Sequence, residues 1–267
     1  MLLREVEYAR PSTLDEALEL LRSNDGARAL AGGQTLINVM KARAASPDLL
    51  VDLADLEELR SISTGAGGLE IGAMATYTQI MASSEVEVTR PIVGEVCATI
   101  ADVQVRNRGT IGGNICSSDP TNHLPALMAA LGATMTILGS DGERTVSSDE
   151  FFIGVFLTAV GLGEVLTKIT IPSGRRDGFA ATTIGADGTC IVNAAATLED
   201  GLRIAIGCVD AVPVVLTPGS ADDAVVRDAV RTAELDPPSD VHASADYRRH
   251  LAEIAAVRAV QQATARS

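Results

Sequence analysis

The stretch Thr110-Ile111-Gly112-Gly113-Asn114 decides the fold of this chain together with a second glycine-rich stretch, Ala31-Gly32-Gly33-Gln34-Thr35. A glycine pair between a strand and a helix allows positive φ angles and lets backbone N–H groups approach a ligand without an intervening Cβ. Such N–H groups, with a helix N-terminus behind them, form a site for an anion. Each pair also has a hydroxyl or amide side chain beside it. We therefore predict that the two loops hold one bulky anionic ligand.

The sequence around the first loop predicts a small α/β unit. Apolar residues recur at helical spacing over 14–23, and Thr13 and Glu16 occupy the positions of a capping box. A short apolar run then enters the glycine pair as a strand. The predicted order is helix 14–23, strand 28–31, helix 35–44 and strand 48–53.

Helical and alternating patterns continue through the rest of the chain. The predicted strands are 68–73, 133–138, 144–147 and 164–171, and the predicted helices are 76–81, 91–101 and 124–131, with Gly132 after the last one. A boundary is expected at Pro172-Ser173-Gly174, because hairpin strands 191–198 and 202–209 and helices 221–234 and 245–263 follow it. We predict three segments: 1–55, 56–172 and 173–267.

The composition excludes several classes of protein. The 267 residues are 46% hydrophobic and 21% charged, with a formal net charge of −14. No basic run offers the positive stripe that nucleic acid requires, so no nucleic-acid partner is expected. There is no apolar run of membrane-spanning length, and charges occupy the N-terminal stretch, so we expect a soluble, cytoplasmic protein. The acid-rich segment 219–247 is interpreted as a solvated face.

The cysteines and known motifs narrow the chemistry further. Cys97, Cys116, Cys190 and Cys208 are scattered without a CxxC pair, so this chain should hold neither an iron–sulfur cluster nor another metal by itself. Buried free thiols are the expected state, with Cys116 the one placed to approach the ligand. Neither glycine loop matches the Walker or GxGxxG pattern. No Ser-His-Asp or paired-carboxylate arrangement indicates hydrolysis.

Local cations near the loops are expected to assist an anion in so acidic a chain. Backbone dipoles and nearby side chains must attract the ligand, because the net charge repels it. The basic residues beside the loops are Arg28, Lys41, Arg43, Arg106 and Arg108.

Three segments together resemble a known family: Ala31–Leu36, Ile71–Thr76 and Gln104–Asn114. They are similar to the FAD-binding medium subunit of the molybdenum hydroxylases, the family of xanthine dehydrogenase and aerobic carbon monoxide dehydrogenase. The similarity continues, in the family's order, through Asp119-Pro120, Phe151-Phe152-Ile153-Gly154 and Tyr247-Arg248-Arg249-His250-Leu251.

The resemblance implies a fold, a cofactor and a site. The fold would be α+β, with a two-subdomain FAD-binding region of the vanillyl-alcohol-oxidase (PCMH) type and a C-terminal domain of antiparallel sheet and helices. The two glycine loops would hold the FAD diphosphate, and Thr76, Ile100 and Ala101 would approach the flavin or its ribityl chain. The implied FAD-binding residues are Arg28, Ala29, Leu30, Ala31, Gly32, Gly33, Gln34, Thr35, Leu36, Thr76, Ile100, Ala101, Thr110, Gly112, Gly113, Asn114, Asp119 and His123.

The resemblance also implies a division of labour. A large partner subunit would carry the molybdopterin cofactor and a small one the [2Fe–2S] clusters, in a dimer of heterotrimers. This chain would pass electrons through FAD to an external acceptor and contribute neither a catalytic side chain nor a metal ligand. Two alternatives stay open: an autonomous FAD-dependent oxidoreductase, and an assembly subunit with a vestigial flavin site.

Two departures from the family pattern concern the flavin side. His123 stands where the family usually has Asp, and it either donates a hydrogen bond to the ribityl or ribose region or serves as a structural or capping residue. The family often has Lys and then Arg in the stretch that here reads Ala180-Ala181-Thr182-Thr183-Ile184-Gly185. Because a positive charge near the ring stabilises reduced flavin, we predict a lower flavin potential than in lysine-containing relatives.

Overall fold

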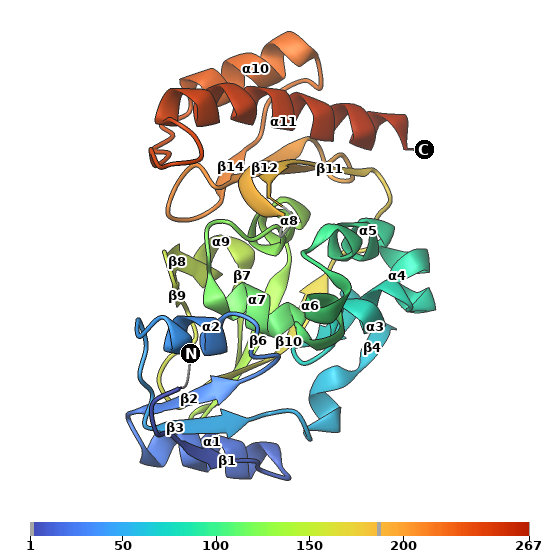
Figure 1. Cartoon of the computed structure of the whole chain (residues 1–267). Helices are drawn as coiled ribbons and strands as arrows, with labels where there is room; N and C mark the ends of the chain where they lie inside the picture. Colours follow the sequence, from blue (N-terminus) through green and yellow to red (C-terminus); the bar gives the residue numbers. More distant parts are fainter. Residues whose placement is uncertain (1–2, 186–187, 267) are drawn as a thin grey trace.

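The computed structural model describes residues 3–185 and 188–266. Within them the strands form a parallel three-stranded sheet, an antiparallel five-stranded sheet, an antiparallel four-stranded sheet and a two-stranded hairpin. The three larger sheets follow one another from the bottom to the top of Figure 1, in chain order from blue to red. No helix in this described part is long and apolar enough to cross a membrane.

The first sheet has the order β1-β3-β2 and carries the first glycine loop at the end of β2. Helix α1 packs on it through Ala17 and Leu21, and Thr13 caps that helix by accepting the N–H of Glu16 at 3.2 Å, as predicted. This unit consists of β1 (Glu7–Ala9), α1 (Leu14–Ser23), β2 (Ala27–Leu30), α2 (Leu36–Lys41) and β3 (Leu49–Asp52).

The second sheet has the order β4-β5-β10-β6-β7 and is covered by short helices. Its core includes the fully buried helix α8, which ends at Gly132 with φ 63°, as predicted. The elements are η1 (Glu57–Arg60), β4 (Ile62–Gly65), β5 (Gly68–Gly72), α3 (Tyr77–Met81), α4 (Ser84–Thr89), α5 (Pro91–Thr99), α6 (Val103–Arg108), α7 (Ile111–Ser117), α8 (Leu124–Leu131), β6 (Thr134–Gly139), β7 (Gly142–Ser147), α9 (Ser148–Phe151), β8 (Phe152–Gly154), β9 (Leu157–Thr158) and β10 (Val165–Ile171).

The third sheet lies between helices of both halves of the chain. Helix α11 packs on one face, and α8 contacts β12 and β13 from the other side (Figure 1). Its elements are β11 (Asp177–Ile184), β12 (Thr189–Thr197), β13 (Arg203–Gly207), β14 (Val214–Leu216), α10 (Asp223–Thr232) and α11 (Ala245–Ala265). The chain is therefore α+β, as predicted.

A buried ion pair joins the second sheet's helices to the third sheet. The guanidinium of Arg90, 1% exposed, donates to the carboxylate of Asp177 at 2.6 Å and to the hydroxyl of Thr197 at 2.8 Å. It also donates to the Pro172 carbonyl at 2.9 Å. These three acceptor atoms link Arg90, which precedes the predicted boundary at 172–174, to Pro172 at that boundary and to β11 and β12, which follow it.

The prediction of a loop at the second glycine pair was wrong. Gly112 and Gly113 lie in the first turn of helix α7, and Thr110 is its N-cap, accepting the N–H of Gly113 at 3.1 Å. The glycines fit a helix here because Gly112 touches a neighbouring backbone that any side chain would displace. Sequence reasoning also missed three short helices, α4, α6 and α9, which have too few residues for a periodic pattern.

Candidate functional site

A cavity of about 640 Å³ lies where the first glycine loop meets helix α7. Its walls come from four stretches of the chain: the first loop with α2, the segment after β5, the turn into α7, and the region of the β8–β9 hairpin and β10. These stretches supply residues 28–36, Val39, Ala44, Ala45, Leu53, Ala73, Met74, Tyr77, Gly109, Thr110, Gly112, Gly113, Asn114, Cys116, Ser117, Phe156, Val160, Glu164, Val165 and Leu166.

The first glycine loop offers free hydrogen-bond donors. Gly33 has φ 73°, which turns the chain from β2 toward α2. Among the described residues, the backbone N–H groups of Gly32, Gly33, Gln34 and Thr35 find no acceptor. Consecutive N–H groups without a protein acceptor form an anion site on a cavity wall. A bound anion accepts the hydrogen bonds that these groups would otherwise lack when water is displaced.

The second glycine stretch differs, because its N–H groups are already used. Ile111 donates to the Ala75 carbonyl at 3.0 Å, Gly112 to the Ala73 carbonyl at 2.9 Å, and Gly113 to the Thr110 hydroxyl. A Cβ on Gly112 would lie 2.5 Å from the Cβ of Ala73. The N–H groups of Ile111, Gly112 and Gly113 are therefore not available to a ligand, and these residues shape the wall of the cavity.

The side chain of Asn114 supplies a polar group to this wall. It is 9% exposed, and its Oδ1 has no hydrogen-bond partner within the described residues. The neighbouring Tyr77 is buried, which raises the pKa of its hydroxyl, and the Asn114 side chain opposes that shift only in part. Tyr77 is accordingly neutral at physiological pH, and Asn114 keeps an acceptor for a hydroxyl donor of a bound ligand.

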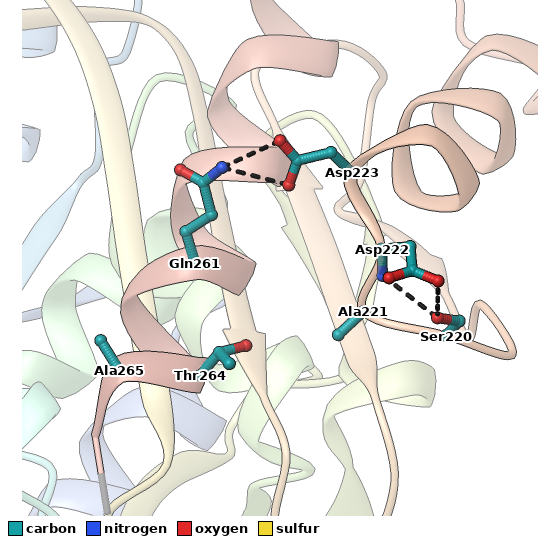
Figure 2. A pocket seen from close by; sticks show the side chains of 7 residues that line it. All are labelled: Ser220, Ala221, Asp222, Asp223, Gln261, Thr264 and Ala265. Atoms are coloured by element: carbon teal, nitrogen blue, oxygen red, sulfur yellow. Dashed lines mark hydrogen bonds between the residues drawn. The ribbon is translucent and has the colours of Figure 1, made fainter.

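A different, open groove in the C-terminal domain lacks such unpaired groups. It lies between the start of α10 and the end of α11, with a volume of about 590 Å³ (Figure 2). The carboxylate of Asp223 accepts from the Gln261 amide at 3.0 Å and 3.1 Å, and Ser220 and Asp222 bond to each other. Its polar side chains satisfy one another, so the cavity at the glycine loop is the candidate site.

Comparison with known proteins identifies the family of this chain and its cofactor. The family described as the FAD binding domain in molybdopterin dehydrogenase matches residues 4–174. The chain belongs to this family. The chain therefore contains an FAD-binding domain.

Similarity extends along the whole chain. The glyceraldehyde dehydrogenase medium chain of Sulfolobus acidocaldarius is 33% identical, covering 97% of this chain and 98% of the relative. The carbon monoxide dehydrogenase medium chain of Afipia carboxidovorans is 35% identical, covering 98% and 97%. Among solved structures, quinoline 2-oxidoreductase from Pseudomonas putida 86 superposes with a TM-score of 0.91 at 34% identity, covering 99% of both chains. Carbon monoxide dehydrogenase from Oligotropha carboxidovorans gives 0.94 at 33% identity and full coverage of both.

The FAD-binding family assignment confirms the predicted cofactor and fold, and it makes the chain an oxidoreductase subunit. The structure brings many of the predicted site residues to one cavity. Those that line it are Arg28, Ala29, Leu30, Ala31, Gly32, Gly33, Gln34, Thr35, Leu36, Thr110, Gly112, Gly113 and Asn114.

Three predicted flavin-side residues lie outside the cavity wall, beyond the turn into α7. Thr76 caps α3 with a complete capping box and bridges to Thr110. Ile100 and Ala101 form a bend whose carbonyls both accept from the guanidinium of Arg106, at 2.9 Å and 2.7 Å. Ala101 has φ 44°, a conformation that a non-glycine residue rarely adopts.

The remaining two predicted residues, Asp119 and His123, are also outside the wall. Asp119 accepts from the backbone and the hydroxyl of Thr121, at 2.9 Å and 2.8 Å. His123 is 6% exposed at the start of α8, with its ring 5.3 Å from that of Phe179. Burial lowers the pKa of His123 to about 4, so it is neutral at physiological pH.

Several wall residues were not predicted from the sequence. Tyr77, Ser117, Phe156 and Val160 line the cavity but belong to no motif that signals a phosphate or flavin site. The quoted similarity at 151–154 stops just before Phe156, so extending it along the chain is the only signal that points there. Cys116 lines the cavity, and burial raises its thiol pKa to about 12, so it stays a neutral thiol.

The basic residues near the loops take different roles. Arg28 donates to the carbonyls of Asp25 and Ala27, and Arg106 holds the bend at Ile100. Lys41 and Arg108 line a shallow pocket of about 270 Å³ on another side of the first glycine loop. No cluster of metal-ligating side chains occurs within residues 3–185 and 188–266.

Proposed function

We propose that this chain is the electron-transfer subunit of a molybdenum-containing hydroxylase or dehydrogenase, and that the cavity at the glycine loop holds its FAD. The observation that supports this most directly is the row of unpaired N–H groups from Gly32 to Thr35 on the cavity wall. Arg28 also lines the cavity, but its guanidinium is bonded to the carbonyls of Asp25 and Ala27. Backbone dipoles therefore compensate the diphosphate.

In the proposed site each part of the wall has one task. The N–H groups of 32–35 bind the diphosphate, and Asn114 accepts a hydrogen bond from a hydroxyl. Gly112 and Gly113 keep this wall free of side chains, since a Cβ on Gly113 would lie 3.3 Å from the Cβ of Ala31. Apolar residues such as Met74 and Leu166 exclude water. FAD supplies the electron-transfer chemistry when bound.

The wider assignment of FAD contacts also remains part of this proposal. Thr76, Ile100 and Ala101 form the flavin side, where the bend held by Arg106 presents its backbone. Asp119 and His123 are proposed to act near the ribityl or ribose region through the segment between α7 and α8.

The partners proposed for this chain are a large molybdopterin subunit and a small [2Fe–2S] subunit in a dimer of heterotrimers. Several relatives are named medium chains, which indicates complexes with further subunits. Electrons would then pass from the [2Fe–2S] clusters to this chain and on to an external acceptor. We infer a cytoplasmic location, supported by four free cysteines.

Absorbance and rapid mixing test this proposal against its two alternatives. The purified full chain should carry a flavin band near 450 nm or gain it from added FAD; a colourless chain that takes up no FAD would indicate a vestigial site. Anaerobic addition of substrate should bleach the flavin only in the presence of both partner subunits. Bleaching of the isolated chain by substrate would support an autonomous oxidoreductase instead.

A further inference from the structure

Phe156 is an aromatic side chain on the cavity wall that the protein leaves uncovered. It lies in the turn of the β8–β9 hairpin, where Gly154 pairs with Leu157, so Val155 and Phe156 form the turn itself. Phe156 is 62% exposed, yet it lines the same cavity as the glycine loop. Covering a large apolar ring with a ligand removes its surface from water, which favours binding.

The backbone holds Phe156 in this position by specific contacts. Its φ is 56°, in the left-handed region that a bulky residue avoids. Its N–H donates to the carbonyl of Ser118 at 3.0 Å, and the Ser118 hydroxyl donates back to the Gly154 carbonyl at 3.0 Å. Ser118 is buried directly after α7 and has a φ of 42°. The turn is thus attached to the helix that carries the second glycine pair.

The part of the cavity around Phe156 is apolar. Most side chains from the hairpin and β10 on this wall are apolar, with Glu164 as the charged exception, whereas the unpaired N–H groups lie on the first glycine loop. Such a wall suits the face of an aromatic ring better than a phosphate or a ribityl chain. The apolar members are Leu53, Met74, Phe156, Val160, Val165 and Leu166.

The position of the predicted flavin side decides which ring of FAD reaches this wall. Thr76, Ile100 and Ala101 do not line the cavity, and Thr76 bridges to Thr110, which does. The diphosphate lies between the two ring systems of FAD, so a flavin placed at these three residues, outside the cavity, directs the other ring toward Phe156. We propose that Phe156 packs against the adenine ring of FAD and is a positioning residue for the cofactor. This inference rests on the proposed function.

The same hairpin contains a matched control. Leu157 is 54% exposed and directly follows Phe156, but it does not line the cavity. Three variants of the full chain separate the possible roles of position 156: F156A removes the ring, F156L retains apolar volume without it, and F156Y retains an aromatic face. L157A reports any general effect of weakening the hairpin.

Titration of the FAD-free full chain and its variants with FAD tests the proposal, with thermal unfolding of each FAD-free protein to verify folding. F156A should raise the Kd for FAD about tenfold, as expected for a lost stacking contact. F156L should be intermediate, and F156Y and L157A should bind like the wild type. ADP should displace FAD from the wild-type chain. Its inhibition constant, calculated with the FAD Kd of each protein, should be higher for F156A than for the wild type.

The outcomes that overturn the inference differ from those that overturn the proposed function. Unchanged FAD affinity in a folded F156A or F156L variant, or equal losses in F156A and L157A, would exclude a contact of Phe156 with the cofactor. Failure of ADP to compete in the wild type, or unchanged ADP competition in F156A, would exclude the adenine assignment. A wild-type chain that binds no FAD would instead contradict the proposed function.

Discussion

The backbone of Gly32 lies directly against the carbonyl oxygen of Arg108, so close that a Cβ on Gly32 would come within 2.1 Å of that oxygen. Gly32 belongs to the first glycine loop, and Arg108 ends helix α6, just before the second glycine stretch. The two stretches are therefore parts of one wall, and glycine at 32 is required by this approach of two backbones.

Replacing Gly32 with Ala should disrupt this contact. Because backbone atoms meet the added Cβ, the loop must shift, at a cost of about 1–3 kcal/mol in the free energy of unfolding. FAD occupancy should fall with it, since the N–H groups of 32–35 move. Urea unfolding and the flavin absorbance of the purified chain measure both effects. Gly219→Ala is the control, because nothing lies within 4 Å of a Cβ there; equal behaviour of the two variants would contradict the prediction.

Replacing Thr110 with Ala should destabilise the chain by about 1 kcal/mol, because the Gly113 N–H loses its capping acceptor. Thr110→Ser retains the hydroxyl and should restore most of that stability. The N–H groups of Ile111, Gly112 and Gly113 are already paired, so the loss in FAD affinity should be smaller than for Gly32→Ala. Chemical unfolding and FAD titration of the three variants test this order; a reversed order of FAD affinity would make Thr110 a direct ligand.

His123 should make the stability of the FAD-free chain depend on pH. Burial lowers its folded-state pKa to about 4, while the unfolded chain takes up that proton near pH 6.5. The unfolded state therefore binds more protons between these values, so stability is complete above about pH 6.5 and falls as the pH drops toward 4. The loss reaches about 3 kcal/mol at the acid end.

The variant His123→Phe isolates this contribution. Phe retains a ring against Phe179 and cannot titrate in this range. Urea unfolding between pH 4 and 8 should show that the free energy of unfolding depends less on pH in the variant than in the wild type. Some dependence remains, because the carboxylates titrate in both proteins. Parallel curves would show that His123 is not the group responsible.

Removing one partner of the buried pair Arg90–Asp177 should lower the free energy of unfolding more than replacing both partners with apolar residues. Burial raises the pKa of Asp177 above its usual range even with Arg90 at 2.6 Å, so desolvation outweighs the attraction. Asp177→Ala leaves a buried, unpaired guanidinium and should cost about 3–5 kcal/mol. The double variant Arg90→Met with Asp177→Leu should lose much less. Urea unfolding of Arg90→Met, Asp177→Leu and the double variant gives the coupling energy, and additive losses would contradict this.

A lysine introduced at Ala181 should raise the midpoint potential of the bound flavin. Ala181 is exposed on β11, while Ala180 and Ile184 pack into the C-terminal core on the other face. The native chain has no cation in 180–185, so its potential should lie below that of lysine-containing relatives. Anaerobic redox titration measures the potential of the variant against the native chain and of the native chain against lysine-containing relatives. The control Thr182→Lys sits on the alternate face; an equal or larger shift from it would contradict the orientation argued here.

Much of the fold and site follows from local sequence. The Thr13 cap, the end of α8 at Gly132 and six strands of the two antiparallel sheets depend on hydrogen bonds and side-chain periodicity within a few residues. The strands β4, β11 and β14 of the same sheets were not predicted. The short helices α4 and α6 were missed because six residues cannot show a helical period. The second glycine pair was assigned to a loop because glycine disfavours helix interiors. In the structure the close contact of Gly112 with Ala73 requires glycine at this position of the helix.

By itself the sequence determined the family and, through its resemblance to that family, the FAD cofactor, and it marked the two glycine stretches that meet at the cavity, because these depend on residue types along the chain. Only the tertiary structure decided that the N–H groups of 32–35 are free while those of α7 are not, that Phe156 faces the cavity, and that Arg90 joins the two halves. Each of these is a contact between segments far apart in the chain. Packing selects such contacts, and no local pattern records which donor will find its acceptor.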